Sequence, residues 1–410
     1  MSFSANTTAS SSVSHDTICL RAGRCKGDGA PIATPIVQTS TFCRDGVGSN
    51  AEHQYSRVSN PTVAALEKTL GELEDALPAT AFGTGLGAEA ALFLGLLKAG
   101  DHVVCGQSVY GGTTRLFHQV LSGLGVETTF VNATDLNEIR AAVRPDTKLI
   151  FVETPANPCL EITDIRGVSR IAKDVGAILA VDNTFLTAVL QKPLDLGADV
   201  SVYSTTKLIE GHSIALGGAI VTRDEDLQAR FRFIRKCTGG IQAPFNAWLT
   251  INGLKTLPLR IRTQSATAQK VAEWLSEHGQ VATVNYPSLA TGKAREIAEV
   301  QHLGAHGAVV SFELQGGFER GKAFVEACQL AELCEHVGSC ETLITHPASM
   351  THADVPQDQR NRAGVTDGLL RLSVGLEPVE EIIADLEQAL AATAVEVDGV
   401  KREEDACLVR

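Results

Sequence analysis

Between about residues 60 and 255, the pattern of hydrophobic positions alternates between two periods. Short, nearly continuous apolar runs typical of buried strands alternate with stretches that carry apolar residues every three or four positions, as helices do. Such a pattern predicts a mostly parallel sheet covered by helices on both faces. The predicted helices are Val63–Leu77, Ala88–Lys98, Leu136–Val143 and Ile165–Val175, and the predicted strands are His102–Cys105, Val126–Val131, Leu149–Glu153, Ile178–Asp182, Val200–Tyr203 and Gly218–Thr222.

The pattern changes after Pro258. A long helix over Ile261–His278 precedes an alternating strand at Ala308–Leu314, a helix around Arg320–Leu333 and a strand at Leu369–Val374. This mixture predicts a smaller α+β domain. The sequence is therefore divided into an N-terminal arm (1–60), a large domain (61–258), a C-terminal domain (259–395) and a tail (396–410).

Composition narrows the classes of function. The 410 residues are 44% hydrophobic, which is enough for two domains with separate cores. The net charge of −13 argues against a nucleic-acid or acidic-membrane partner, although small anions can still be held locally. No apolar run reaches the ~18 residues of a membrane helix. The first fifteen residues lack the features of a signal peptide, so a cytoplasmic location is expected. Ten cysteines without a C-x-x-C pair predict reduced thiols and no metal site.

Lys207 is the first candidate for chemistry. It ends the run Ser204-Thr205-Thr206-Lys207, directly after a predicted buried strand. A lysine beside hydroxyls at a strand end suits pyridoxal phosphate (PLP), because the amine can form a Schiff base with the aldehyde and the hydroxyls can hold the phosphate. Taken alone, the same pattern also fits an ordinary polar strand end.

The glycine-rich loop Gly83–Gly87 leads into a predicted helix. Its backbone amides and the helix N-terminus suit a phosphate group. A nicotinamide-dependent oxidoreductase is the alternative that this loop suggests, but the spacing is not G-x-G-x-x-G and the expected acid is missing.

Three further residues are ambiguous one at a time. Asp182, at a strand end, suits a protonated pyridine nitrogen or the cap of a turn. Tyr110, before two glycines, suits stacking on a planar ring or packing in the protein. Arg371, inside an apolar strand, suits a substrate carboxylate or an internal salt bridge. Together with Lys207 and the glycine loop they form a set that no other common cofactor requires.

At this point the sequence resembles the Cys/Met-metabolism family of fold-type I PLP enzymes, which includes cystathionine γ-synthases and γ-lyases, methionine γ-lyases and O-acylhomoserine sulfhydrylases. The resemblance covers roughly residues 15 to 395 and implies a seven-stranded, mostly parallel sheet. Its motifs are Tyr55-Ser56-Arg57-Val58-Ser59-Asn60-Pro61-Thr62, Glu153-Thr154-Pro155-Ala156-Asn157-Pro158, Val181-Asp182-Asn183-Thr184, Ser204-Thr205-Thr206-Lys207, His346-Pro347-Ala348-Ser349-Met350-Thr351-His352 and Arg371-Leu372-Ser373-Val374-Gly375.

The resemblance implies a role for each matching residue. Lys207 carries the cofactor and shuttles protons, Asp182 pairs with the ring nitrogen, and Tyr110 stacks on the ring. The ring hydroxyl contacts Asn157. The resemblance also implies a catalytic dimer within a homotetramer, with His346 and His352 in a structural turn rather than at a metal. The remaining implied contacts are Thr84, Gly85, Leu86, Ser204 and Thr206 to the phosphate, Tyr55 and Arg57 to the phosphate of the neighbouring subunit, and Arg371, Glu341, Thr342, Ser339 and Arg115 to the amino-acid substrate.

Departures from the family bear on the reaction. Gly112 stands where methionine γ-lyases have cysteine, and Gln54 replaces an acid of several cystathionine enzymes. Glu341 matches the acid of cystathionine γ-synthases and γ-lyases, and Arg115 suits a second carboxylate such as a succinyl group. The expected activity is γ-replacement on an O-acylhomoserine by cysteine or sulfide. A cystathionine γ- or β-lyase is the nearest alternative, and an inactive homologue is disfavoured because the residue set is complete.

Overall fold

A computed structural model describes residues 13–353 and 357–394 of the chain. The first twelve residues and the predicted tail (396–410) lie outside this description. The boundaries of the arm and of the two domains remain predictions.

The larger sheet has seven strands in the order β1-β7-β6-β5-β4-β2-β3. Strands β2 to β6 pair in parallel, and β7 pairs antiparallel with both β1 and β6. The prediction of a mostly parallel, seven-stranded sheet is thus confirmed. The strands are β1 (Thr80–Phe82), β2 (His102–Gly106), β3 (Glu127–Val131), β4 (Thr147–Glu153), β5 (Ile178–Asp182), β6 (Val200–Tyr203) and β7 (Gly218–Thr222).

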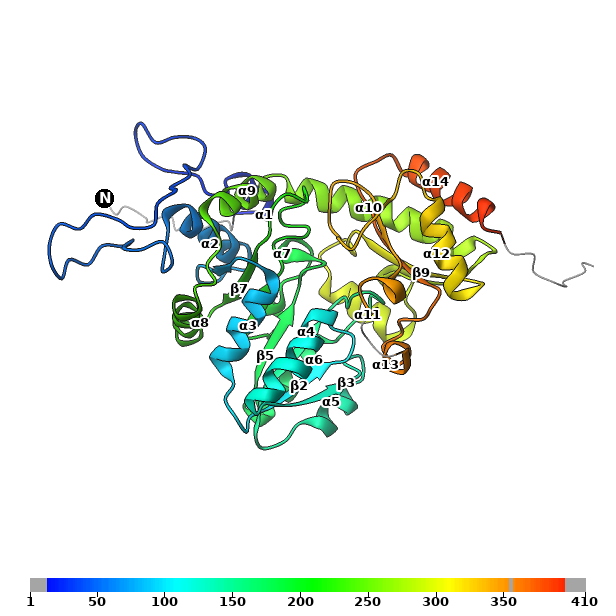
Figure 1. The fold of residues 1–410 in the computed structure, drawn as a ribbon, viewed down its shortest axis with the longest axis horizontal. Coiled ribbons are helices and arrows are strands. Elements are labelled where there is room, and N and C mark those ends of the chain that lie inside the picture. The colour runs from blue at the N-terminus through cyan, green and yellow to red at the C-terminus, as the bar shows by residue number, and fades with distance from the viewer. Residues whose placement is uncertain (1–12, 354–356, 395–410) are drawn as a thin grey trace, which may run out of the picture.

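Successive residues of a strand point to opposite faces of the sheet, so the side chains on the two faces pack against different helices. Val103, Phe151 and Val202 pack with α3 and α8 on one face. Their neighbours Val104 and Val152 pack with α5 and α6 on the other face. Figure 1 shows these helices around the larger sheet, as the alternating pattern predicts. The helices of this half are α2 (Pro61–Leu73), α3 (Gly85–Leu96), α4 (Gly111–Arg115), α5 (Leu136–Ala142), α6 (Ile165–Val175), α7 (Thr187–Leu190), α8 (Glu225–Thr238) and α9 (Pro244–Leu254).

The second sheet has five strands in the order β10-β11-β12-β9-β8. Helices α10, α12 and α14 cover one of its faces. The elements are β8 (Val281–Asn285), β9 (Val309–Leu314), β10 (Glu332–Leu333), β11 (Leu343–Thr345), β12 (Leu369–Ser373), α10 (Leu257–Glu277), α11 (Gly292–Gln301), α12 (Gly317–Ala327), α13 (Gln357–Arg362) and α14 (Val379–Ala392).

Helix α10 connects the two halves (Figure 1). Its first turns, with Leu257 and Ile261, pack in the core of the larger half. Its later residues, including Val271 and Leu275, pack in the core of the second sheet. The predicted boundary after Pro258 therefore falls in the first turn of a helix that both cores share.

Two predicted helices are too long. The helix predicted over Arg320–Leu333 ends at Ala327, and Glu332–Leu333 form strand β10. The Asp385 carboxylate of α14 accepts hydrogen bonds from the amides of Gln329 (2.7 Å) and Ala331 (2.9 Å), which directs the chain away from a helical path. Helix α2 ends at Leu73 rather than Leu77, because the chain folds back there and the Ala76 amide bonds the carbonyl of Gly71.

The segment before α2 contains helix α1 (His15–Leu20) and long loops that extend away from the larger sheet (Figure 1). The segment ends where the Asn60 side chain caps α2, with its oxygen accepting from the Thr62 amide at 3.0 Å. No helix among residues 13–353 and 357–394 is long and apolar enough to cross a membrane. The nine cysteines in the described part of the chain are free thiols.

Candidate active site

The carboxyl ends of the parallel strands bring several predicted residues to one edge of the larger sheet. Strands β4 and β5 end side by side at Glu153 and Asp182, which are register partners. Strand β6 ends at Tyr203, just before the Ser204–Lys207 run. The N-terminus of α3 reaches the same place, since a Cβ on Gly85 would lie 2.8 Å from the Cβ of Ser204. Ligands of parallel sheets bind at this edge.

The turn from Thr84 to Leu86 has the form of an anion site. Thr84 caps α3 by accepting a hydrogen bond from the Gly87 amide at 2.9 Å. The amides of Gly85 and Leu86 lie in the first helical turn, where amides have no partner within the helix. Because Gly85 has no side chain, Ser204 approaches this turn closely. The Thr206 hydroxyl donates to the Gly217 carbonyl and accepts from the Gly217 amide, so it supports the loop, and its contact with a phosphate stays a prediction.

Three buried carboxyl groups gather beneath this edge: Glu89, Glu153 and Asp182. The two oxygens of Glu153 accept from the amides of Tyr110 (2.7 Å) and Asn157 (2.9 Å). Asp182 accepts from the Thr184 amide at 2.8 Å, and Glu89 accepts from the Thr113 hydroxyl at 2.7 Å. Glu153 thus positions the two residues predicted to touch a cofactor ring, Tyr110 and Asn157.

Burial raises the pKa of all three acids. The pKa of Asp182 rises to about 6, against the opposing effect of the Thr184 hydrogen bonds. Burial and the nearby Asp182 raise the pKa of Glu89 to about 8 and that of Glu153 well above its usual range. Among the described residues, no cation is a cause of the shift of the Asp182 pKa. A cationic ligand, such as a protonated ring nitrogen, fits the site next to Asp182.

Glu89 provides a test of this electrostatic picture. A group whose pKa is higher in the folded protein than in the unfolded chain loses its stabilising effect as pH rises, here from about 4.5 to about 8. Glu89→Gln keeps an oxygen for Thr113 but does not titrate. We expect its free energy of unfolding, relative to that of the wild-type apoprotein, to rise by about 3 kcal/mol between pH 5 and pH 8. Urea titrations at several pH values measure this difference, and a difference that stays constant with pH would contradict the picture.

Arg371 reaches the same edge from the second sheet. Its neighbours Leu370 and Leu372 face the core formed with α10, α12 and α14, so Arg371 points the other way. Its Nη1 donates to Asn157 Oδ1 at 2.9 Å. Its Nη2 donates to the carbonyls of Glu335 (3.1 Å) and His336 (3.0 Å) and to Thr345 Oγ1 (3.0 Å).

No carboxylate pairs with Arg371 among the residues that the structure describes. Its Nε is buried and lacks a hydrogen-bond partner. The internal salt bridge considered from the sequence is therefore absent from this part of the chain. A guanidinium group that is only 2% exposed and has an unsatisfied N–H suits an incoming carboxylate.

Lys207 lies between the sheet edge and the loop that holds His336. Its Nζ lies 3.4 Å from His336 Nδ1. Burial and the Arg371 guanidinium lower the pKa of Lys207 from 10.5 to about 8, with Cys334 and Glu335 acting in the opposite direction. A larger fraction of this amine is therefore neutral near pH 8 than is usual for lysine. A neutral amine is required both for attack on an aldehyde and for proton removal.

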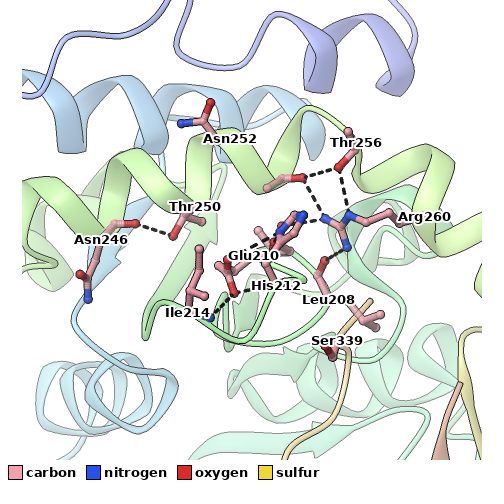
Figure 2. A network of polar contacts seen from close by, with 12 residues as sticks. Leu208, Glu210, His212, Ile214, Asn246, Thr250, Asn252, Thr256, Arg260 and Ser339 are labelled. Carbon is pink, nitrogen blue, oxygen red and sulfur yellow. Dashed lines mark hydrogen bonds and ion pairs between the residues drawn. The ribbon is translucent and has the colours of Figure 1, made fainter. Parts of the chain in front are cut away.

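The segment after Lys207 is held by a buried arginine (Figure 2). Arg260 of α10 donates to the carbonyls of Leu208 (2.9 Å) and Ile209 (3.3 Å), and also to that of Gly253 (2.8 Å). The Glu210 carboxylate accepts from the amides of His212 and Ile214 and closes the turn. Arg260 thereby fixes the backbone that follows the lysine.

Gly211 packs directly against this arginine and has a φ of +75°. A methyl group there would overlap Arg260 Nη1 and impose a left-handed conformation on alanine. We expect Gly211→Ala to lower the free energy of unfolding by about 3 kcal/mol and to reduce activity, since the Leu208 and Ile209 carbonyls lose their donor.

Gly176 is the matched control, because its φ of +68° is similar but no atom would lie within 4 Å of a Cβ added there. Gly176→Ala should cost only about 1 kcal/mol. Equal losses of stability in the two variants would show that Arg260 packing contributes nothing at position 211.

Three other predicted residues, Tyr110, Arg115 and Glu341, have exposed side chains. Tyr110 is 43% exposed at the start of α4, and its ring lies against Gly112, where a Cβ would come within 2.5 Å of the ring. Arg115 is exposed at the end of the same helix. Glu341 is exposed after Cys340, whose amide bonds the Gly211 carbonyl. These three side chains border the lysine loop and the Tyr110 helix.

Two predicted substrate contacts are largely used inside the protein. The Thr342 hydroxyl donates to Glu377 (2.7 Å) and accepts from the Gly375 amide (2.9 Å). Ser339 is buried and accepts hydrogen bonds from the Glu341 amide and, at its carbonyl, from Gln264. A direct substrate contact of either residue stays a prediction that this geometry does not favour.

Tyr55 and Arg57 lie on the N-terminal arm rather than beside Lys207. Tyr55 is 44% exposed, and the Arg57 guanidinium lies 5.2 Å from its ring centroid. Arg57 also donates to the Lys236 carbonyl at 2.6 Å. Gln54, on the same arm, accepts a hydrogen bond from Arg44 at 3.3 Å. His346 bonds Ser349 and the Asp367 carbonyl, each at 2.8 Å, which supports the structural turn predicted for it.

Sequence reasoning missed Glu89, His336 and Arg260 and assigned Glu153 no contact. Glu89 and Arg260 are charged residues at buried helix positions, and that combination was a usable signal. His336 gave no signal, because its stretch was predicted to follow directly after a helix and only the packing of the second sheet brings it to Lys207.

The residues present fit PLP on several structural grounds. The Gly85 turn brings the first amides of α3 against Ser204, the Asp182 pKa is shifted by no cation of the described residues, and Arg371 Nε lacks an acceptor. Each unsatisfied group corresponds to one part of the cofactor or of an amino-acid substrate.

Comparisons with known proteins agree with this geometry. Residues 16–391 match the family described as Cys/Met metabolism PLP-dependent enzymes. The chain is 42% identical over 359 residues to a cystathionine gamma-lyase of Bacillus subtilis, covering 88% of this chain and 94% of that protein. It is 43% identical over 360 residues to a cystathionine gamma-synthase of Mycobacterium bovis, covering 88% and 92%. A crystal structure of cystathionine gamma synthase from Xanthomonas oryzae pv. oryzae with aminoacrylate and cysteine superposes with a TM-score of 0.90 at 40% identity, covering 93% of this chain and 98% of that chain.

Proposed function

This chain belongs to the family of Cys/Met metabolism PLP-dependent enzymes, and from that membership we propose that it catalyses γ-replacement on an O-acylhomoserine. Cysteine or sulfide is the nucleophile, and the product is cystathionine or homocysteine. The family and its relatives identify the chain as a PLP-dependent trans-sulfuration enzyme. What we propose beyond this is the acyl group of the substrate and the direction of the reaction.

PLP, when bound, supplies an aldehyde that reacts with amines and a protonated ring that withdraws electrons from the substrate. In the proposal, Asp182 holds the proton on the ring nitrogen, because its buried carboxylate ends strand β5 at the sheet edge that Lys207 also reaches. The Gly85 and Leu86 amides with Ser204 and Thr206 hold the phosphate. Tyr110 would cover the ring, and Asn157, whose amide is held by Glu153, would contact the ring hydroxyl.

Lys207 moves the protons in this proposal. Its amine, with a pKa lowered to about 8, takes the proton from the substrate Cα and returns protons along the carbon chain. Arg371 holds the α-carboxylate and so directs the Cα–H bond towards Lys207. Arg260 holds the Leu208 carbonyl directly after the lysine (Figure 2), and in the proposal this keeps the amine at the reacting atoms.

The observation that carries the choice of reaction is a pair of exposed charges, one beside the lysine loop and one at the end of the Tyr110 helix. Glu341 lies next to the lysine loop and suits the amino group of an incoming cysteine. Arg115, at the end of the Tyr110 helix, suits the distal carboxylate of a succinyl group. Opposite charges at these two places match a substrate and a nucleophile of opposite distal charge.

Two incubations of the purified holoenzyme test this proposal. With O-succinylhomoserine and cysteine, we expect cystathionine to accumulate with little 2-oxobutanoate. With cystathionine alone, we expect slow release of 2-oxo acids. Rapid cleavage of cystathionine without any γ-replacement would reject the proposal.

A cystathionine γ- or β-lyase is the second candidate. The similarity to the gamma-lyase of Bacillus subtilis favours a lyase as strongly as the similarity to the gamma-synthase of Mycobacterium bovis favours γ-replacement. The same two incubations separate the candidates, and the oxo acid formed from cystathionine distinguishes cleavage at Cγ from cleavage at Cβ.

We also propose that the arm completes the site of a second copy of this chain, within a homotetramer. The arm carries exposed apolar residues, including Leu20, Ile32 and Val47, and it extends away from its own sheet (Figure 1). Tyr55 and Arg57 lie on it and suit the phosphate of the neighbouring subunit.

Mixing two inactive variants tests this arrangement. Unfolded and refolded together, Lys207→Ala and Arg57→Ala subunits should form hybrids with one intact site and recover up to about a quarter of the activity, as random pairing of subunits gives. No recovery from verified hybrids would contradict the shared site.

A further inference from the structure

The loop between β10 and β11 places an imidazole at the reactive amine. His336 Nδ1 lies 3.4 Å from Lys207 Nζ. The opposite ring nitrogen, Nε2, is buried and has no hydrogen-bond partner among the described residues. The imidazole therefore makes its contact on the Lys207 side.

The backbone of this loop is fixed independently of the imidazole. Arg371 Nη2 donates to the carbonyls of Glu335 and His336. The Gly338 amide donates to Ser373 Oγ at 2.8 Å. Gly338 has a φ of +86° and packs so closely on Leu208 that a Cβ would lie 2.6 Å from the Leu208 amide nitrogen. The position of His336 is thus set by β12 and by the lysine loop.

The surroundings make an acceptor for Lys207 necessary. When the Lys207 amine removes a proton, it becomes an ammonium group, and this charge forms close to the Arg371 guanidinium. A buried ammonium group without acceptors is costly. Besides His336, the groups that act on Lys207 are Arg371, which disfavours the charged amine, and Cys334 and Glu335, which favour it.

We infer that His336 is a positioning residue for Lys207. The Nδ1 atom of His336 accepts a hydrogen bond from the Lys207 amine whenever that amine is not bound to the cofactor. This inference rests on the role of Lys207 as the base in the proposed reaction. The hydrogen bond orients the free amine and supports its protonated form. No bond other than a hydrogen bond forms or breaks at the imidazole.

The ionisation of the ring agrees with this role. Burial, together with Lys207 and Arg371, lowers the pKa of His336 to about 4. The imidazole is consequently neutral near pH 7, and a neutral ring with its proton on Nε2 presents a lone pair at Nδ1. A hydrogen bond that stabilises the protonated form of an amine raises the pKa of that amine.

Three substitutions test the inference on the apoprotein. Acetylation of Lys207 by acetic anhydride, followed against pH by mass spectrometry of its peptide, gives the pKa of the amine, with exposed Lys293 as the internal reference. His336→Ala should lower the pKa of Lys207 by about one unit, since a charge-assisted hydrogen bond is lost. His336→Asn places an amide oxygen near the Nδ1 position and should keep the wild-type value. His336→Gln reaches the Nε2 position instead and should behave like alanine.

The same variants, loaded with cofactor, give the kinetic readout. The value of kcat should fall about tenfold in His336→Ala and His336→Gln and should be restored in His336→Asn. An unchanged or raised pKa of Lys207 in His336→Ala overturns the inference, and so does an equal loss in His336→Asn and His336→Gln. If the alanine variant does not fold, the comparison of the asparagine and glutamine variants decides. The apoprotein measurement does not depend on which sulfur reaction the enzyme catalyses, so a failure of the proposed function would be seen separately.

Discussion

Replacing Lys207 by alanine is expected to lower turnover by at least about 10⁴-fold, because two proton transfers lose their base and each is worth about 10²–10⁴. Lys207 lies three residues after Ser204 at the edge that Glu153 and Asp182 form. The change removes a side chain whose backbone is held by Arg260 and Gly338, so the fold of the loop should remain. Steady-state assays at saturating cofactor measure the loss.

Lys293→Ala, at an exposed position of α11, is the matched control and should keep full activity. Added ethylamine should restore part of the turnover of Lys207→Ala, since the amine can enter the space left by the lysine side chain. A Lys207→Ala enzyme that keeps more than a tenth of the activity would remove Lys207 from the mechanism.

Arg371→Met is expected to lower kcat/KM by about 10²–10⁴-fold. Two hydrogen bonds between a guanidinium and a carboxylate are each worth about 1.5–3 kcal/mol, and methionine keeps the volume without the donors. The buried Nε without a partner is the observation behind this prediction. Part of the loss will be structural, because Arg371 also bonds the carbonyls of Glu335 and His336.

Ligand binding separates the two contributions. The wild-type holoenzyme should bind alanine much more tightly than ethylamine, and Arg371→Met should bind the two ligands almost equally. Spectral titration of the cofactor measures both affinities. A variant that still prefers alanine by the wild-type factor would show that Arg371 does not bind the carboxylate.

Much of the larger sheet was predictable, because its strands are buried on both faces. Strands β5, β6 and β7 have the predicted boundaries, and the carboxyl edge then follows from topology. The predicted helix over Arg320–Leu333 was wrong because Asp385, which is distant in sequence, captures the amides of Gln329 and Ala331. Local periodicity contains no information about such a contact.

The candidate site was predictable to the extent that single strand ends determine it. Lys207, Asp182 and Asn157 all follow parallel strands, and Arg371 is conspicuous as a charge in an apolar strand. Glu153 needed the structure, since only the fold shows its two oxygens on the Tyr110 and Asn157 amides. His336 needed it as well, because a loop of the second sheet crosses to the edge of the first.

Reductive trapping of the holoenzyme tests the central claim most directly. Borotritide reduces the bond between the cofactor and its lysine, and digestion then locates the labelled peptide. The account predicts loss of the yellow colour and one equivalent of tritium per subunit, all of it on the peptide that contains Lys207. Label on another lysine, or a coloured protein that takes up no tritium, would contradict it.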